Sequence, residues 1–122
     1  MNFGDFYWHD AIILNIVIDR SNPGRIDTIL FEIEFPDLGK VNFVFDKVYW
    51  IKMDLNFGMV VSENILKAFI ADRSDTDFVY ISSKWKKFID LDIAKLDCYV
   101  IELNSTGGEI KIIATGFRVS TR

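Results

Sequence analysis

Hydrophobic and polar residues alternate along most of the chain with the period of two that is typical of β-strands. In segment 29–35 the odd positions are Ile, Phe, Ile and Phe, whereas the even positions are Leu, Glu and Glu. This alternation predicts a strand with one buried face and one mostly solvated face. The preceding segment, 11–19, has β-branched residues on both faces. It predicts a strand that is covered on both sides and therefore lies in the interior of the sheet.

Turn residues separate the predicted strands. Pro23 and Gly24 provide the chemistry of a type II turn, because proline fixes the second φ angle and glycine accepts the positive third one. Residues 41–55 keep one apolar parity except at Lys47, which predicts a bulge or bend near Asp46-Lys47 in an otherwise very long strand. The remaining predicted strands are 65–71, 97–103 and 109–119.

Residues 74–89 follow a different pattern. Phe78, Ile81, Trp85 and Phe88 occur at helical spacing, after the possible N-caps Ser74, Asp75 and Thr76. The competing interpretation is a strand over 78–81, where the residue types favour a sheet. Spacing and caps favour the helix over intrinsic propensity.

These elements predict a mainly β or α+β fold. We expect an antiparallel sheet, or a sandwich, of about six strands with one short helix. With 122 residues, the whole chain (1–122) forms one domain.

Composition excludes several classes of protein. Half of the residues are hydrophobic, which argues against disorder, and the net charge of −4 argues against nucleic-acid binding. A single cysteine, Cys98, excludes a disulfide scaffold and a cysteine-rich zinc site. The first six residues contain no basic residue, and the apolar stretch 11–18 is too short to span a bilayer. We therefore expect a cytoplasmic protein without membrane contact.

Candidate catalytic chemistry depends on His9, which is the single histidine and stands beside Asp10. These two residues form either a structural polar cluster or part of a catalytic pocket; no nucleophile motif supports the second interpretation. The acidic stretch 72–77 does not fit a calcium-binding loop and is predicted to be a solvated loop that caps the helix. Carboxylate pairs such as Asp90 and Asp92 lack a spacing that would single them out. No catalytic residue, metal ligand or cofactor is predicted.

Aromatic residues are the remaining unexplained feature. Trp50 lies on the parity opposite Tyr49 and Ile51, beside Lys52. It is either an exposed hot spot for a binding partner or a residue that covers the second face of the sheet, packing on Trp85.

The opening Tyr7-Trp8-His9-Asp10-Ala11 resembles the start of small uncharacterised bacterial proteins, some of which are grouped with immunity proteins of polymorphic toxin systems. The segments 54–58 and 104–107 are similar to turns in such proteins. This resemblance implies a cytoplasmic, acidic, non-enzymatic protein that neutralises a toxin by binding it.

The sequence thus predicts a non-enzymatic protein-binding module, with toxin immunity as its most concrete form and a basic toxin as partner. The alternatives are an enzyme or small-molecule binder that uses His9 and Asp10 in a pocket, and a homo-oligomer assembled through a sheet edge. The predicted binding residues are Trp8, His9, Asp10, Trp50, Asp54 and Asn56.

Overall fold

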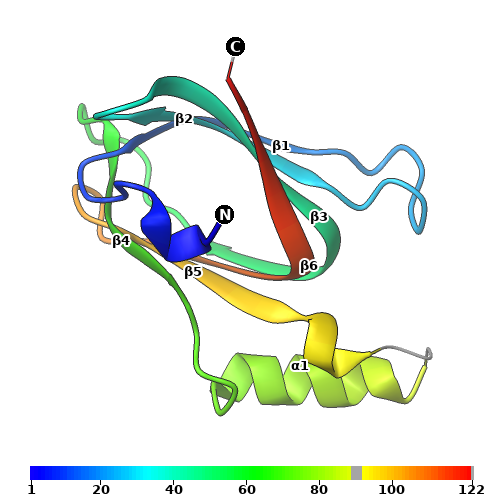
Figure 1. Cartoon of the computed structure of the whole chain (residues 1–122). Coiled ribbons are helices and arrows are strands. Elements are labelled where there is room, and N and C mark those ends of the chain that lie inside the picture. Colours follow the sequence, from blue (N-terminus) through cyan, green and yellow to red (C-terminus); the bar gives the residue numbers. More distant parts are fainter. Residues whose placement is uncertain (89–91, 122) are drawn as a thin grey trace.

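Antiparallel strands close into a barrel in the computed structural model, which describes residues 1–88 and 92–121 (Figure 1). The strands follow the order β1-β2-β3-β6-β5-β4 around the barrel. Their bounds are β1 (Ile12–Ile18), β2 (Ile29–Phe35), β3 (Gly39–Asp54), β4 (Glu63–Ile70), β5 (Asp97–Leu103) and β6 (Glu109–Thr121). The helices are η1 (Phe3–Asp5), α1 (Thr76–Lys86) and η2 (Ile93–Lys95). The predicted class, a mainly β antiparallel fold with one short helix, is confirmed.

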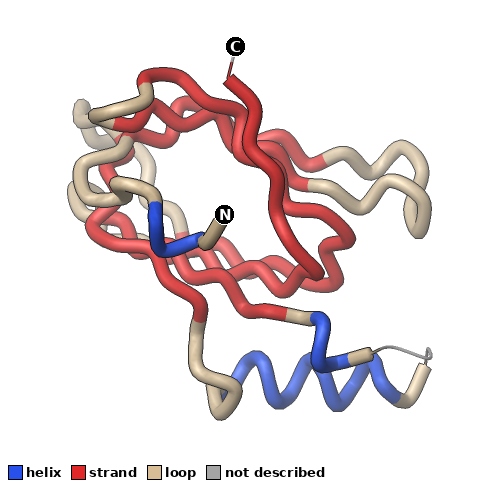
Figure 2. Tube along the Cα trace, in the orientation of Figure 1, coloured by secondary structure: helices blue, strands red, loops and turns tan. Residues whose placement is uncertain are grey.

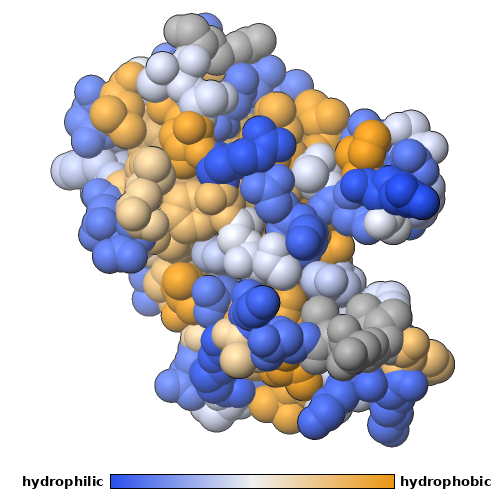
Figure 3. Space-filling model, turned by 45° about the vertical axis from the view of Figure 1, so that its right-hand side comes forward, coloured by the Kyte–Doolittle hydropathy of each residue, from blue (hydrophilic) through white to orange (hydrophobic). Residues whose placement is uncertain are grey.

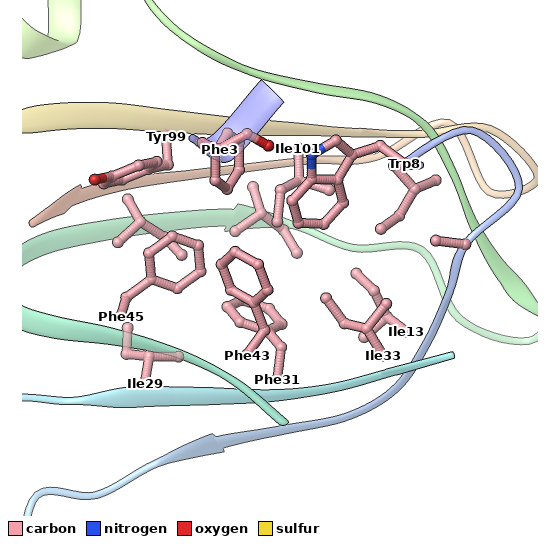
Figure 4. Close-up of a cluster of buried hydrophobic side chains, with 14 of the residues drawn as sticks. Phe3, Trp8, Ile13, Ile29, Phe31, Ile33, Phe43, Phe45, Tyr99 and Ile101 are labelled. Atoms are coloured by element: carbon pink, nitrogen blue, oxygen red, sulfur yellow. Dashed lines mark hydrogen bonds between the residues drawn. The ribbon is translucent and has the colours of Figure 1, made fainter. Parts of the chain in front are cut away.

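The barrel interior is filled by the apolar face of each alternating strand. Phe31 and Ile33 of β2 and Phe43 and Phe45 of β3 are fully buried, and Ile101 of β5 faces them (Figure 4). A six-stranded barrel is narrow, so side chains occupy the space that a larger barrel leaves for a ligand. The interior is therefore a packed core.

The N-terminal segment covers one opening of this barrel (Figure 2). Phe3 in η1 is buried, and its ring lies 4.8 Å from that of Trp8 and 4.9 Å from that of Tyr99. The indole Nε1 of Trp8 donates a hydrogen bond to the Phe3 carbonyl oxygen at 2.7 Å, so the buried polar group is satisfied. Phe3 and Trp8 together close the hydrophobic core from this end.

The seam between β1 and β4 is short. Only Ile12 and Ile13 of β1 pair with β4, opposite Asn64 and Glu63, and residues 15–18 pair with β2 alone. The prediction that β1 is covered on both faces is wrong. Leu14, Val17 and Ile18 are exposed, because no other element packs over the outer face of this strand.

The predicted irregularity in β3 is confirmed. Lys47 has a φ angle of +49°, and the register with β6 shifts between Val48 and Trp50, so that Tyr49 is an extra residue. Because of this bulge, Lys47 stays outside while Val48 packs against the core. Ile51 then returns to the inward-facing side, which preserves the apolar parity of the strand.

Helix α1 lies outside the barrel against β5 and β6 (Figure 1). Asp75 is its N-cap and accepts a hydrogen bond from the backbone N–H of Phe78 at 3.0 Å. Phe78 and Ile81 are buried against the barrel, as the spacing predicts, whereas Phe88 lies beyond the last helical turn and is exposed. Ile89, where the predicted helix ended, lies outside the described residues, as does Asp90.

Replacing Phe3 with alanine is expected to lower the free energy of unfolding by about 3–4 kcal/mol, because it leaves a cavity under Trp8. Phe57→Ala is the matched control, since this ring is 85% exposed, and it should change stability by less than about 0.5 kcal/mol. Urea denaturation measures the free energy of unfolding of both variants. Equal effects of the two substitutions would show that η1 does not close the core.

Candidate functional site

The six residues predicted to bind a partner lie in four separate places, one of which is formed by His9 and Asp10 on the surface. Trp8 is buried in the plug at the barrel opening, where its ring and Nε1 hydrogen bond serve the core. Trp50 lies beneath α1, and Asp54 and Asn56 lie at the end of β3 and in the loop that follows. The structure therefore does not join them into one site.

His9 and Asp10 lie together on the surface. The His9 Nε2 is 3.6 Å from Asp10 Oδ2, and its Nδ1 lies 3.1 Å from the carbonyl oxygen of Leu66. Both side chains are more than half exposed. The backbone of Asp10 is left-handed, and its N–H donates to the Ile65 carbonyl oxygen, which positions the pair at the β1–β4 seam. Because both side chains are open to solvent, the arrangement is that of a surface polar pair rather than an enclosed acid–base site.

Trp50 is half-buried and packs with Tyr49 against the hydrophobic cluster between α1 and the barrel. Trp85 belongs to the same cluster, and its ring makes an edge-to-face contact with Tyr49, with centroids 6.3 Å apart. This placement supports the interpretation that Trp50 covers the second face of the sheet. The bulge in β3 explains why two successive aromatic residues both face α1.

An ion-pair cluster fastens the start of α1 to the barrel. The Lys111 Nζ of β6 lies 2.8 Å from Asp75 Oδ1 and 2.9 Å from Asp77 Oδ2. Burial alone would raise the pKa of Asp75, but the hydrogen bond from Lys111, the Phe78 N–H and the attraction of the ammonium together lower it. The two carboxylates likewise raise the pKa of Lys111 despite its burial.

Cys98 lies beneath α1 in the same cluster. Burial, followed by the nearby charge of Asp75, raises the pKa of its thiol to about 11. The thiol is therefore protonated at neutral pH and unreactive.

A row of carboxylates crosses the outer face of three strands at the other end of the barrel. Asp54 of β3 lies opposite Glu109 of β6, which in turn lies opposite Glu102 of β5. Of these three residues, only Glu102 has an ion pair within the described part of the chain, to Lys67 at 3.9 Å. Adjacent like charges across strands cost stability. This acidic row (Asp54, Glu102 and Glu109) therefore concentrates negative charge on one surface, with Lys52 lining the same hollow.

The β3–β4 loop (residues 55–62) carries a group of exposed apolar side chains next to the acidic row. Phe57 is 85% exposed and Val60 is 103% exposed, and Met59 and Val61 are also exposed. We call these four residues the apolar tip. They were not predicted as binding residues, although the run Phe57-Gly58-Met59-Val60-Val61 is an apolar signal in a segment between strands.

Hydrogen bonds hold this loop against the β5–β6 turn. Asn56 Nδ2 donates to the Thr106 carbonyl oxygen at 2.9 Å, and Ser105 Oγ donates to the Ser62 carbonyl oxygen at 2.5 Å. The turn itself approaches β3 so closely that a side chain at Gly108 would collide with the Asp54 carbonyl oxygen. The segments 54–58 and 104–107, singled out in the sequence, thus lie side by side and present the apolar tip on a fixed support.

A cleft of about 930 Å³ opens between the β1–β2 hairpin loop and α1. Space-filling atoms show it as a notch between two lobes (Figure 3). The hairpin loop carries Pro23-Gly24 as the predicted turn, with the Arg25 N–H donating to the Asn22 carbonyl oxygen at 3.1 Å and φ +82° at Gly24. We call the cleft between this loop and α1 the cationic cleft. Its charged and aromatic lining residues are Arg20, Arg25, Asp27, Asp46, Lys47, Tyr49 and Trp85.

The described residues contain no group of three or more His, Cys, Asp or Glu side chains arranged to hold a metal ion. His9 lines neither the cationic cleft nor the shallower hollows beside α1, beside the acidic row and beneath the β1–β2 hairpin. None of the helices within 1–88 and 92–121 is both long enough and apolar enough to cross a membrane.

Comparison with known proteins gives no match: no family model, curated protein or solved structure is significantly similar to this chain. The geometry of its surfaces is therefore the basis for assigning a function.

Trp50→Ala is expected to lower the free energy of unfolding by about 2 kcal/mol, because the indole fills part of the interface between α1 and the barrel. Tyr80→Ala on the solvent side of the same helix is the control and should cost less than about 0.5 kcal/mol, since Tyr80 is exposed. Thermal denaturation compares them. Wild-type stability of Trp50→Ala would show that the indole does not support α1.

Lys111→Met is expected to lower the free energy of unfolding at pH 7 by about 2–4 kcal/mol, because it leaves Asp75 and Asp77 without their cation. The stabilisation from Asp75 is fully present above its ordinary pKa of 3.8 and is lost as pH falls through its lower folded pKa. Lys111 stabilises fully below its ordinary pKa of 10.5 and ceases to do so as pH rises through its higher folded pKa. The variant should therefore lose less stability than wild type towards both extremes of pH.

Lys52→Met provides the control for this experiment. Lys52 lies directly opposite Lys111 on β3 and is exposed. Removing it should leave stability within about 0.5 kcal/mol of wild type and should not change the pH profile. If both lysine variants behave alike, the ion-pair cluster does not fasten α1.

Proposed function

We propose that this chain is a non-enzymatic protein-binding module that contacts its partner through the apolar tip and the adjoining acidic row. The observation that carries the proposal is the exposure of Phe57 and Val60 on a loop that hydrogen bonds hold in place. Exposed apolar groups on a rigid support favour association, because burying each such side chain contributes roughly 1.5–3 kcal/mol.

The acidic row indicates the charge of the partner. Three neighbouring carboxylates with one ion pair among the described residues repel one another, and a cationic surface that covers them would relieve this repulsion. A basic protein with an apolar depression complements this surface in charge and shape, and opposite charges also accelerate encounter. Of the predicted binding residues, Asp54 belongs to the acidic row, and Asn56 anchors the loop that carries the apolar tip.

Toxin immunity is the most concrete form of this proposal. A small acidic protein that covers a basic toxin fits the surface described above and the resemblance at residues 7–11. The expected mode of action is occlusion by binding.

The alternative function as an enzyme or small-molecule binder that uses His9 and Asp10 is not favoured by their geometry, since both side chains are more than half exposed and the pair lines no cleft described above. Assembly of a homo-oligomer through the free edge of β1 remains compatible with the unpaired side of residues 15–18.

The test uses the proteins encoded by the genes next to this one, each purified and titrated with the wild-type chain by calorimetry. We expect a basic neighbour to bind, and the double substitution Phe57→Ser with Val60→Ser to weaken binding about 30- to 100-fold. Glu109→Gln should weaken it less, and mainly at low salt. If the neighbour is a toxin, co-expression of wild type but not of the double variant should restore growth.

The matched control is Val79→Ser with Tyr80→Ser, which removes an exposed valine and an exposed aromatic ring from the solvent side of α1. This variant should bind like wild type. Loss of binding in the control but not in the loop variant would contradict the proposed surface. Failure of every neighbouring gene product to bind would contradict the immunity proposal.

A further inference from the structure

The cationic cleft is separate from the apolar tip and has the volume of a small-molecule site. Its walls come from different elements: the β1–β2 hairpin loop supplies Arg20 and Arg25, the β3 bulge supplies Lys47 and Tyr49, and α1 supplies Trp85. Positive side chains and aromatic rings therefore face a common space in a chain whose net charge is −4.

Two of the cations in this cleft are not neutralised by the residues that the structure describes. The carboxylate of Asp27 is 3.5 Å from Arg20 Nη1 and accepts the Gly24 N–H, and the carboxylate of Asp46 accepts from Arg118 Nε at 3.2 Å. Within the described ranges, neither Arg25 nor Lys47 makes an ion pair. These two side chains remain available to an anion.

The backbone conformation of Lys47 is a second observation that favours a binding role for this cleft. Its left-handed φ angle of +49° is strained for a residue with a Cβ, and glycine or asparagine would adopt it at lower cost. The bulge thus explains the conformation but not the choice of lysine. Strain retained at a residue that lines a cleft is characteristic of functional positions.

Two aromatic residues of the cationic cleft, Tyr49 and Trp85, offer a second kind of contact to a ligand. Tyr49 and Trp85 meet edge to face at an interplanar angle of 65°, and both partly exposed residues line the cleft. Aromatic faces of this kind bind flat heterocycles by stacking, with little dependence on which heterocycle is present.

We infer that the cationic cleft binds a nucleoside monophosphate, with its phosphate held by Arg25 and Lys47 and its base against Trp85. A phosphate monoester carries close to two negative charges at neutral pH, which two free cations match. A guanidinium can also bind two phosphate oxygens at once. The overall acidity argues against a long basic face for nucleic acid, but it does not oppose a single cleft with local positive charge.

The probe is AMP, titrated by calorimetry at low ionic strength into the full chain. We expect a Kd on the order of 10–100 µM. Adenosine lacks the phosphate and inorganic phosphate lacks the base, so each should bind at least about tenfold more weakly. Raising the salt concentration should weaken AMP binding, because the site is partly exposed.

Arg25→Gln and Lys47→Gln should each weaken AMP binding about tenfold. Lys47→Gly is the sharper variant: it should weaken binding equally, yet raise the Tm by about 2–5 °C, because glycine relieves the left-handed strain. Lys40→Gln is the control, since Lys40 is an exposed lysine at the far end of β3 that does not line the cleft. It should bind AMP like wild type.

The outcomes separate clearly. AMP that binds no better than adenosine or phosphate, or Arg25 and Lys47 variants that bind like wild type, would overturn the inference. Tighter binding of phosphotyrosine than of AMP would also overturn it. A short oligoadenylate that binds more tightly than AMP, and loses this affinity with Arg25→Gln, would support the same chemistry and assign it to single-stranded nucleic acid. None of these results depends on the apolar tip.

Discussion

The bulge in β3 is the constraint on which the rest of this structure depends. A strand of 16 residues in a small barrel must bend, and strict alternation from Phe45 would place Lys47 in the core. A left-handed turn at Lys47 and the extra residue Tyr49 solve both problems, since they move the lysine outside and return Ile51 to the interior. The same insertion turns Tyr49 and Trp50 outward together, where both pack against the hydrophobic cluster beneath α1. Tyr49 also lines the cationic cleft.

Because the barrel is packed with its own side chains, its interior offers no space for a ligand. Phe31, Phe43 and Phe45 fill it from the strands, and Phe3 closes it from the N-terminal plug. Binding functions must therefore use features added to the outside: the β3–β4 loop, the β1–β2 hairpin and α1. This division of roles is common, since loops carry function while a rigid scaffold positions them.

Much of the fold could be predicted because it depends on local patterns. Alternation located the strands, the caps and spacing located α1, and the interruption at Lys47 located the bulge. The exposure of β1 could not be predicted, because it depends on where the barrel closes and on which strands α1 covers. The candidate binding surfaces were harder still to predict from the sequence. The acidic row exists only through the register of β3, β5 and β6, and Arg25 and Trp85 line one cleft only after the hairpin and helix are placed in space.

The net charge of the chain hides a separation of negative and positive charge between two parts of its surface. Asp54, Glu102 and Glu109 concentrate negative charge beside the apolar tip, whereas Arg25 and Lys47 leave positive charge in the cleft below the β1–β2 hairpin. Each group is costly while it remains without a partner, since neighbouring like charges repel and a strained backbone is maintained at Lys47. Fold stability alone would favour neutral residues at these positions and glycine at position 47. The physical argument for the two proposed binding surfaces of opposite charge is that both depart from the residues that a purely structural role would favour.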